Sequence, residues 1–422
     1  MIIRLSVENF KSIYAKQVLD MEAGFYPEMA ENNTFEWCSE FDSQRLLNTS
    51  AIYGANASGK SNLINALSTM RNMVLKSSQW QVDHKLPYSP YKLSKESQKS
   101  PTEFEVEFIS NNVRYLYGFS FNETKILTEY LFSYPKKKPR QWFLRAWDGE
   151  THKWDFGRSF IGEKQSWVNT TKENSLFLST AVQLNSTQLK DVFSWFASNI
   201  AIAGIEGWGS GFTSKQCVKA EHKEKVIKLL KDVDIVVDDI QVDAQEFDVS
   251  KLSDEIPPSF KEKIAEKLKG ETFYETKFVR NDESGEPVTF DMEEESDGTN
   301  RFFSFAGPWL DALESGKTLF VDELNSNLHP LLVKHMVQLF HCKKSNPNNA
   351  QLIFTTHETS ILNQSVFRRD QVWFMQKQDF KSNLYSLSEF KVRKDHENLE
   401  ERYLNGSYGA LPFIPWEACH GE

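Results

Sequence analysis

One stretch, Gly54–Ser61 (GANASGKS), constrains the fold of this 422-residue chain more than any other. It follows the apolar segment Thr49–Tyr53, and apolar residues then recur every three or four positions from Leu63 to Val74. This order predicts a buried strand, a glycine-rich turn and an amphipathic helix. Such a turn is typical of a P-loop, whose backbone N–H groups point at phosphate beside the positive end of a helix. An ordinary glycine–serine turn is the alternative, and the flanking elements disfavour it.

Two residues at the end of this loop carry the predicted chemistry. Lys60 is expected to reach the β- and γ-phosphates of a nucleotide, and the Ser61 hydroxyl to bind Mg²⁺. The chain has no Asn-Lys-x-Asp motif of the kind that binds guanine, which favours ATP over GTP. The residues predicted to contact ATP in this loop are Gly54, Asn56, Gly59, Lys60, Ser61 and Asn62.

Two further strands are predicted to end at titratable side chains. The apolar run Leu319–Val321 precedes Asp322 and Glu323, and another apolar strand ends at His357. Ligands of open α/β sheets bind at the carboxyl ends of strands. We therefore expect Asp322 to hold Mg²⁺, Glu323 to activate water as a general base, and His357 to contact the γ-phosphate. Solvated acids and a surface histidine are the plainer alternatives. The predicted catalytic residues are Lys60, Glu323 and His357.

A second serine–glycine turn opens a helix predicted over residues 299–313. Ser296 and Gly298 lie at its N-terminus, where free backbone N–H groups can bind an anion. A simple capping turn is the alternative, because Ser, Asp and Thr are all good N-caps.

The remaining pattern predicts an α/β fold with an antiparallel β-layer. Apolar and polar residues alternate with a period of two over residues 102–167, which is typical of antiparallel strands. Strands and helices alternate from residue 299 onward, which indicates a parallel sheet. Residues 23–45 are expected to form a loop, and residues 259–269 and 359–363 are expected to be helical. The predicted parts are an N-terminal head segment (1–175), a helical insertion (176–285) and a C-terminal head segment (286–422).

Composition narrows the class of protein. Hydrophobic residues make up 40% of the chain, no apolar run reaches about 18 residues, and the N-terminus alternates like a strand rather than a signal peptide. We therefore expect a cytoplasmic protein with no membrane partner. The net charge of −10 disfavours a globally basic nucleic-acid binder. Nucleic acid stays a candidate partner through the basic, aromatic cluster Lys136–Phe143; the alternative is a solvated hairpin tip whose tryptophan packs inward.

Taken in order, these motifs resemble the ABC-type ATPases of the AAA family, in the branch that contains SMC proteins, RecF and the OLD nucleases. Within that branch the chain is similar to single-chain ATPases of bacterial anti-phage and abortive-infection loci, the AbiLi/RloA-type group. The resemblance covers about the first 75 and the last 130 residues. The stretches that carry it are Val7–Ser12, Gly54–Ser61, Ser296–Arg301, Asp322–Pro330, Phe367–Phe374 and Tyr403–Pro412.

The resemblance implies ATP and Mg²⁺ as cofactors and a homodimer or higher homo-oligomer. Two heads of this kind close on ATP, so Ser296 and Gly298 would act in trans on nucleotide held by the other copy. It further implies a sensor or switch that controls a separate effector, a nuclease or toxin, in anti-phage defence. Asn325 stands where the family usually has Asp in the loop after Glu323, a departure that bears on coupling between the two sites.

The lengths of the insertion and of the segment after His357 distinguish this chain from other members of this branch. The insertion lacks the sustained heptads of SMC arms, and only 65 residues follow His357, without a nuclease-type acidic cluster. This chain is therefore expected not to be the nuclease itself. A transporter motor is disfavoured because the insertion offers no clear coupling surface for a membrane partner. Two alternatives stay open: a RecF-like DNA-repair ATPase that clamps DNA, and an ATP-gated scaffold with little hydrolysis.

Overall fold

The computed structural model describes residues 1–39, 42–246, 257, 261, 272–392 and 397–412. The chain divides into two compact units. The first unit comprises Met1–Ile205, Ala312–Ser326 and Val333–Glu422, and the second comprises Glu206–Asp311 and Asn327–Leu332. Two helices, α9 (Asp297–Ser315) and α10 (Pro330–His341), contribute residues to both units. In the described ranges, no helix has the length and hydropathy needed to cross a bilayer.

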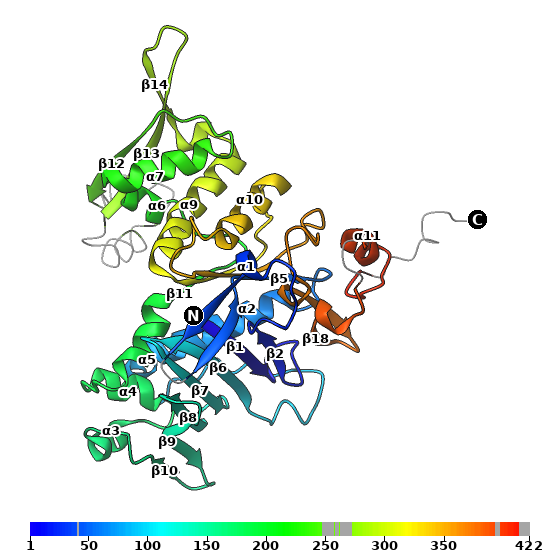
Figure 1. Cartoon of the computed structure of the whole chain (residues 1–422). Coiled ribbons are helices and arrows are strands. Elements are labelled where there is room, and N and C mark those ends of the chain that lie inside the picture. The colour runs from blue at the N-terminus through cyan, green and yellow to red at the C-terminus, as the bar shows by residue number, and fades with distance from the viewer. Residues whose placement is uncertain (40–41, 247–256, 258–260, 262–271, 393–396, 413–422) are drawn as a thin grey trace. The chain divides into compact units, whose positions relative to one another are not determined.

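A six-stranded sheet in the first unit is parallel except at one edge (Figure 1). Its order is β11-β15-β16-β5-β17-β18, and only β17 and β18 pair antiparallel. Every residue of β15, β16 and β5 is buried, which explains why these strands are near-continuous apolar runs. The strands are β5 (Thr49–Tyr53), β11 (Ile200–Ala203), β15 (Thr318–Val321), β16 (Gln351–Thr355), β17 (Val372–Gln378) and β18 (Lys381–Ser386).

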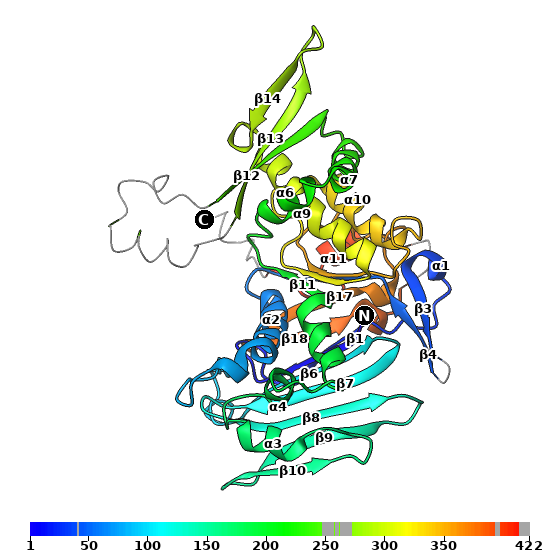
Figure 2. The same cartoon turned by 90° about the vertical axis from the view of Figure 1, so that its left-hand side faces the viewer.

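A seven-stranded antiparallel sheet, in the order β10-β9-β8-β7-β6-β1-β2, completes the first unit's β-structure together with a small hairpin (Figure 2). The predicted α/β fold with an antiparallel layer is thus confirmed. Its strands are β1 (Ile2–Glu8), β2 (Gln17–Asp20), β6 (Thr102–Ser110), β7 (Val113–Phe121), β8 (Ile126–Tyr134), β9 (Arg140–Trp147) and β10 (His152–Phe156).

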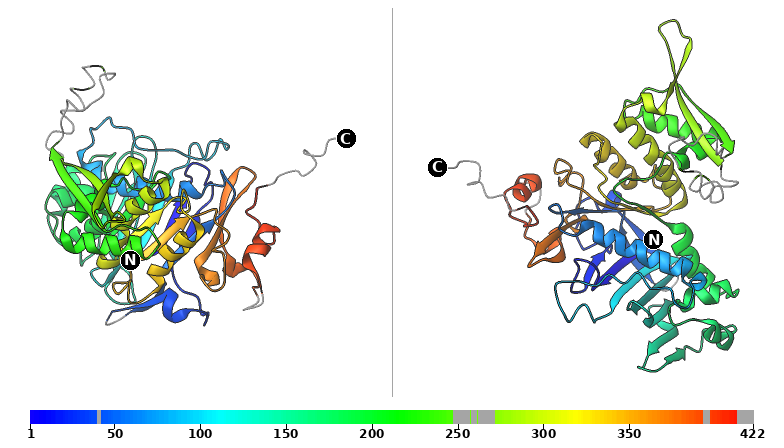
Figure 3. Two further views of the ribbon diagram at one scale, coloured as in Figure 1. Left: turned by 90° about the horizontal axis from the view of Figure 1, so that it is seen from above. Right: turned by 180° about the vertical axis from the view of Figure 1, so that it is seen from behind.

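Helix α2 (Lys60–Lys76) packs on both sheets of the first unit (Figure 3). Its buried Leu63 and Leu67 belong to one apolar cluster with Ile52 of β5 and Val106 of β6. The helix that follows the P-loop is therefore held by the core on two sides. The other helices of this unit are α1 (Ala30–Asn33), α3 (Lys164–Thr170), α4 (Phe177–Gln183), α5 (Lys190–Ser194), a π-helix (Trp195–Asn199), α11 (Leu399–Leu404) and 3₁₀ turns at Ser77–Gln79, Arg369–Gln371 and Leu387–Glu389.

Two local expectations for this unit are wrong. The predicted loop at 23–45 contains the hairpin β3 (Thr34–Cys38) and β4 (Ser43–Leu47), because Phe35 and Trp37 pack against Leu46 and Ile3 from the first strand. The helix expected near 359–363 is a series of turns. There, short polar side chains bond nearby backbone instead: the Asn363 amide oxygen accepts from the Ser365 N–H at 2.7 Å, a contact that competes with a helix.

The second unit contains helices and a three-stranded antiparallel sheet, β12-β13-β14. The prediction of a helical insertion at 176–285 is therefore wrong in part, because this range also contains strands. The helix expected at 259–269 lies outside the described residues, except for Lys261. Ile240 is buried in β12, and Thr276 and Phe278 are buried two residues apart in β13, a short period-two signal hidden among lysines and glutamates. The elements are α6 (Gly211–Cys217), α7 (Ala220–Lys231), β12 (Asp239–Glu246), β13 (Thr272–Asn281), β14 (Pro287–Asp291) and a 3₁₀ turn at Met292–Glu294.

Helix α9 runs through Pro308, although proline supplies no N–H for the helical hydrogen bond. The carbonyl of Ser304 is the group left without that donor, and it accepts a hydrogen bond from the Thr213 hydroxyl at 3.3 Å. The Thr213 oxygen in turn accepts from the Gly307 N–H at 3.1 Å. One side chain of α6 therefore repairs the gap that the proline leaves.

A buried ion pair ties the antiparallel sheet to the start of α4. Glu129 and Arg145 are both fully buried, with 3.6 Å between Oε2 and Nη1. Glu129 accepts hydrogen bonds from the N–H groups of Phe177 and Leu178, and Arg145 donates to the Ser175 carbonyl. Burial raises the pKa of Glu129 and lowers the pKa of Arg145 to about 10. Both shifts arise because removing a charge from water is unfavourable.

We predict that Glu129→Gln lowers the free energy of unfolding by about 3 kcal/mol, because it leaves a buried guanidinium without its counter-charge. The matched control is Glu123→Gln, which breaks the exposed Lys85–Glu123 pair and should change stability by less than about 1 kcal/mol. Urea denaturation of both variants measures the difference. Equal stabilities would contradict a structural role for the buried pair.

Candidate functional site

Three neighbouring strands bring the predicted motifs to one edge of the parallel sheet. β5 leads into the P-loop, β16 leads to His357, and β15 leads to Asp322 and Glu323. These strands pair in the order β15-β16-β5, all parallel, so their carboxyl ends lie at the same edge. Electrostatic interactions link Lys60 with both carboxylates and with His357. The structure therefore brings Lys60, Asp322, Glu323 and His357 together in the first unit.

Two serines from distant parts of the chain support the P-loop. The Ser382 hydroxyl donates to the Ser58 carbonyl at 2.6 Å, and the Ser12 and Ser382 hydroxyls are 2.6 Å apart. Ser12 also accepts a hydrogen bond from the Asn62 amide at 2.7 Å. Gly59 has φ +108°, and a Cβ there would lie 2.2 Å from the Ser382 hydroxyl. Only glycine allows both this backbone angle and this close approach.

The segment after α11 contacts the other end of the P-loop. The Ala55 N–H donates to the Ala410 carbonyl at 2.9 Å, and the Tyr403 hydroxyl donates to the same carbonyl at 3.3 Å. The Tyr403 ring packs edge-on against Tyr53, the last residue of β5, with centroids 5.8 Å apart. The loop beyond His357 is held by the same segment, since the Thr359 hydroxyl donates to Glu400 at 2.7 Å. Residues 397–410 therefore connect two parts of the site.

Lys60 is only 5% exposed. Its ammonium group donates to the carbonyls of Gly54 at 2.8 Å and Ala55 at 3.1 Å. Burial lowers the pKa of Lys60 to about 8, although Glu323 and Asp322 act to raise it. A lysine ammonium has three donors, so two carbonyls leave one for a phosphate oxygen.

Thr355, the last residue of β16, orients the acidic pair. Its hydroxyl donates to Asp322 Oδ1 at 2.6 Å and accepts from the Glu323 N–H at 2.8 Å. Asp322 is 4% exposed, whereas Glu323 is partly exposed and has φ +51°. A non-glycine residue in the left-handed region is strained, and such strain clusters at functional sites. Thr355 lies two residues before His357 in the sequence, but a strand-end threonine carries no local signal for this bridging role.

Asn325 connects the acidic loop to the histidine strand. Its side-chain oxygen accepts from the Thr356 hydroxyl at 3.0 Å and from the His357 N–H at 3.2 Å. His357 Nε2 lies 3.9 Å from Glu323 Oε1. Burial and then the Lys60 charge lower the pKa of His357, so this imidazole is neutral near pH 7 and can donate from one nitrogen and accept at the other. Asn325 thus has a role within one chain that the sequence did not predict.

Comparison with known families now identifies the domain. A family model described as "AAA domain, putative AbiEii toxin, Type IV TA system" matches residues 50–162 and 212–363, well over half of the chain. The chain belongs to this AAA family. The predicted membership of the AAA-type ATPases is confirmed, and the P-loop is that of a nucleotide-binding ATPase domain. No curated protein matches the chain.

The chain is also similar in structure to solved proteins, of which three are described here. The SMC head domain from Thermotoga maritima is 12% identical and matches over 93% of this chain and 99% of that chain, with a TM-score of 0.42. The Smc head domain with an extended coiled coil bound to the C-terminal domain of ScpA, from Pyrococcus furiosus, is 14% identical over 91% and 96%, with a TM-score of 0.35. The recombination mediator protein RecF-ATP is 14% identical over 91% and 99%, with a TM-score of 0.31.

The donor types at the edge of the AAA sheet fit Mg²⁺. The Ser61 hydroxyl lies in the first turn of α2, and the buried Asp322 carboxylate follows β15, the second strand from β5. Hydroxyl and carboxylate oxygens are the protein ligands that Mg²⁺ takes alongside phosphate and water. Asp322 Oδ1 is already engaged by Thr355, which fixes the direction of the second carboxylate oxygen. Among the described residues, no group of three His, Cys, Asp or Glu side chains forms a metal cluster of its own.

Ser296 and Gly298 belong to the second unit of the AAA chain. The Ser296 hydroxyl accepts from the Thr299 N–H at 3.1 Å, so Ser296 caps α9, as the simpler sequence alternative proposed. A Cβ on Gly298 would lie 3.4 Å from the Asn327 carbonyl. Their role toward nucleotide in a second copy stays a prediction.

The basic cluster at 136–140 forms the exposed tip of the β8–β9 hairpin. Trp142, next along β9, is buried against Tyr115 and Phe160, with ring centroids at 5.4 and 6.2 Å. The alternative of a solvated tip with an inward tryptophan is therefore confirmed for Trp142. The exposed basic side chains of this tip are its lysines and Arg140.

We predict that Gly59→Ala abolishes binding of a non-hydrolysable ATP analogue, because its Cβ would displace Ser382 from the P-loop. Gly149→Ala is the matched control: Gly149 has a similar φ of +110°, but no atom within 4 Å of the added Cβ. Both variants should lose about 1–2 kcal/mol of stability from the left-handed backbone. Only Gly59→Ala should lose the ligand in calorimetric titration, and normal binding by it would refute the close-approach argument.

The lowered pKa of Lys60 predicts a pH-dependent affinity. The protonated ammonium binds phosphate, so affinity should be retained below pH 8 and fall about tenfold per unit above it. Lys60→Met should bind the analogue weakly with no such fall, which separates lysine titration from titration of the nucleotide. Titration calorimetry from pH 6.5 to 9.5 measures both profiles. A wild-type affinity that stays constant to pH 9.5 would exclude the shifted lysine.

Proposed function

We propose that this AAA chain hydrolyses ATP with Mg²⁺ and that ATP draws two copies together, switching a separate effector in anti-phage defence. The observation that carries the proposal is the convergence of Lys60, Asp322, Glu323 and His357 at one edge of three parallel strands. P-loop ATPases work by positioning phosphate and stabilising its charge, which needs this set of groups.

Each residue has a distinct task in this proposal. The N–H groups at the start of α2 lack a side-chain cap and bind the phosphates together with Lys60. Glu323, partly exposed and oriented by Thr355, accepts a proton from the attacking water. Neutral His357 donates a hydrogen bond to the γ-phosphate. Ser61 and Asp322 would hold Mg²⁺, which would supply positive charge beside the phosphate oxygens.

Closure of two copies rests on the α9 N-terminus. Ser296 is exposed and Gly298 half-buried, so a second copy has access to this turn. Nucleotide in one P-loop would meet Ser296 and Gly298 of the partner copy, and the glycine lets the backbone approach phosphate closely. The Asn325 side chain accepts a hydrogen bond from the His357 N–H in the same chain. It would therefore couple the nucleotide state of the site to the contact between the two copies.

The family description names a toxin and a toxin–antitoxin system, which supports a role in a growth-arrest response. We infer that the ATP-bound assembly restrains a nuclease or toxin supplied by another chain and that hydrolysis resets it.

The deciding experiment measures ATPase rate and particle mass together. Glu323→Gln should keep ATP binding, lower turnover at least 100-fold, and accumulate as an ATP-dependent dimer or larger assembly. Glu150→Gln, an exposed loop substitution, should behave as wild type. Equal turnover in Glu323→Gln and wild type would exclude the general-base role. Stimulation of turnover by DNA would instead favour a repair-type clamp over an effector switch.

A further inference from the structure

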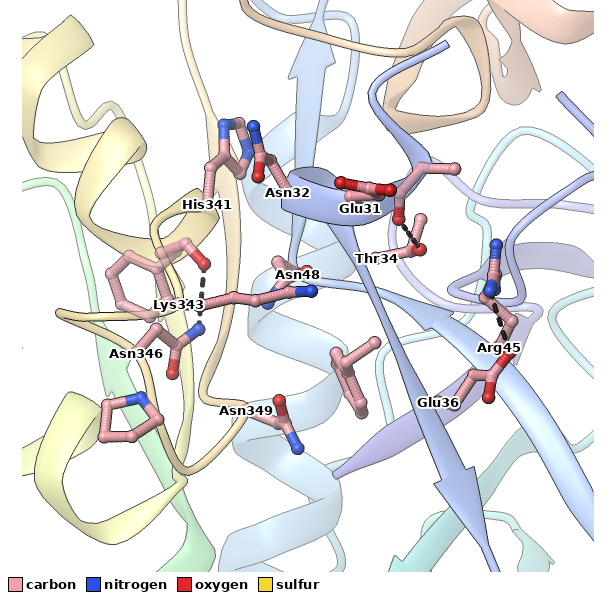
Figure 4. A pocket seen from close by; sticks show the side chains of 14 residues that line it. Glu31, Asn32, Thr34, Glu36, Arg45, Asn48, His341, Lys343, Asn346 and Asn349 are labelled. Atoms are coloured by element: carbon pink, nitrogen blue, oxygen red, sulfur yellow. Dashed lines mark hydrogen bonds and ion pairs between the residues drawn. The ribbon is translucent and has the colours of Figure 1, made fainter. Parts of the chain in front are cut away.

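The strands β5 and β16 are fixed to their surroundings at their amino-terminal ends. A cavity at this edge of the sheet is lined by Asn48, which precedes β5, and by Asn346, in the loop before β16 (Figure 4). The Asn48 carbonyl accepts a hydrogen bond from the Leu352 N–H at 2.9 Å, and the Asn346 amide donates to the Phe340 carbonyl at 2.9 Å. These bonds restrict movement of β5 relative to β16 at this edge.

At their carboxyl ends the same two strands lead into separate loops. The last paired residues are Ile52 and Thr355, and the Thr356 N–H donates to the Ile52 carbonyl at 3.1 Å. Beyond them β5 continues into the P-loop, and β16 continues into residues 357–364, which we call the histidine loop because it begins with His357. The position of this histidine relative to the P-loop therefore depends on the contacts that hold the two loops.

Residues 397–410, which include α11, hold the histidine loop through two side chains (Figure 1). We call this segment the strap. The Thr359 hydroxyl donates to the Glu400 carboxylate at 2.7 Å, and the Gln364 amide donates to the Glu397 carbonyl at 2.9 Å. A hydrogen bond to a carboxylate is stronger than one between neutral groups. The histidine loop is therefore fixed to the start of the strap.

The other end of the strap holds the P-loop. The Ala410 carbonyl accepts a hydrogen bond from the Ala55 N–H at 2.9 Å and another from the Tyr403 hydroxyl at 3.3 Å. Ala410 is buried and has φ +57°, a strained backbone angle for a residue with a side chain. Such strain persists only where the surrounding structure holds the backbone. The carbonyl that contacts the P-loop is therefore held in place by the fold of the strap.

One carboxylate joins the two ends of the strap. The Tyr408 hydroxyl donates to Glu397 at 2.9 Å, and Arg402 forms an ion pair with the same carboxylate. The Glu397 side chain is 7% exposed and Tyr408 is 1% exposed. Their hydrogen bond therefore lies in a low-dielectric environment, where it is stronger than in water. This bond makes the strap one body, with the histidine loop attached at its start and the P-loop at its end.

We propose that the strap positions His357 relative to Lys60, so that the histidine loop and the P-loop bind a γ-phosphate together. The inference rests on the proposed ATPase site and adds the means by which that site prefers ATP to ADP. Thr359 and Tyr408 are positioning residues in this arrangement, because they act through the two loops. ADP lacks the phosphate that His357 is proposed to contact, so its binding should not depend on the strap.

Nucleotide binding to the full chain tests this proposal. Titration calorimetry measures the affinities for ADP and for a non-hydrolysable ATP analogue, and wild type should bind the analogue more tightly. Thr359→Val removes the bond to Glu400 and should reduce this preference about tenfold, with the ADP affinity unchanged. Thr359→Ser keeps a hydroxyl and should retain the preference. The matched control is Thr170→Val, which removes a threonine hydroxyl bond to the Ser166 carbonyl on α3 and should leave both affinities unchanged.

A second variant tests whether the strap acts as one body. Tyr408→Phe removes the bond to Glu397 and leaves the contacts of Thr359 and Ala410 in place. It should reduce the preference for the analogue to a similar extent as Thr359→Val. The double variant should lose no more than either single variant, because both substitutions interrupt the same connection. Wild-type preference in Tyr408→Phe would overturn the proposal.

Three other results would also overturn it: equal losses of ADP and analogue affinity in Thr359→Val, a Thr359→Ser variant as impaired as Thr359→Val, or a wild type that binds both nucleotides equally. The ADP affinity of each variant shows that its P-loop is folded. The assay needs no turnover, so an absence of ATP hydrolysis in wild type would refute the proposed ATPase alone, and the measured affinities would still judge the strap. A wild type that binds neither nucleotide would refute both.

Discussion

The parallel pairing of β15, β16 and β5 is the constraint on which the candidate site depends. Each strand contributes one motif at its end, so the register of the pairs sets the distances between the motifs. Thr355 ties the register of β16 and β15 to the site, because its hydroxyl donates to the Asp322 carboxylate and accepts from the Glu323 N–H. A shift of one residue in β16 would point this side chain to the other face of the sheet and release both acids.

Burial gives the same site its electrostatic character. Desolvation lowers the pKa values of Lys60 and His357, and two carboxylates beside Lys60 partly offset this effect. The lysine stays charged at neutral pH while the histidine stays neutral. The two groups can therefore share one small site without strong mutual repulsion, and the Lys60 donors remain directed by backbone carbonyls rather than by water.

Local signals explain which parts were predictable from sequence. The P-loop, Asp322, Glu323 and His357 were found because glycine spacing and apolar strands are visible in a short window. The roles of Ser382, Asn325 and Ala410 within the chain were not predicted, because they arise from contacts between ordinary residues far apart in the sequence. The hairpins at 34–47 and in the second unit were missed because their strands are short or mostly polar. The trans role of Ser296 and Gly298 depends on a second copy and stays a prediction.

The hydrogen bond between Ala55 and Ala410 has a consequence for how the protein is made. The P-loop sequence leaves the ribosome more than three hundred residues before the carbonyl that holds it, and β5 also waits for β16 and β17 before it has neighbours. Contacts of such long range form late and slow folding. During synthesis the nascent chain therefore exposes an apolar strand without its partners, a state that favours chaperone binding. Nucleotide binding is delayed until residue 410 has been made, so products truncated before it would be inactive rather than partly competent.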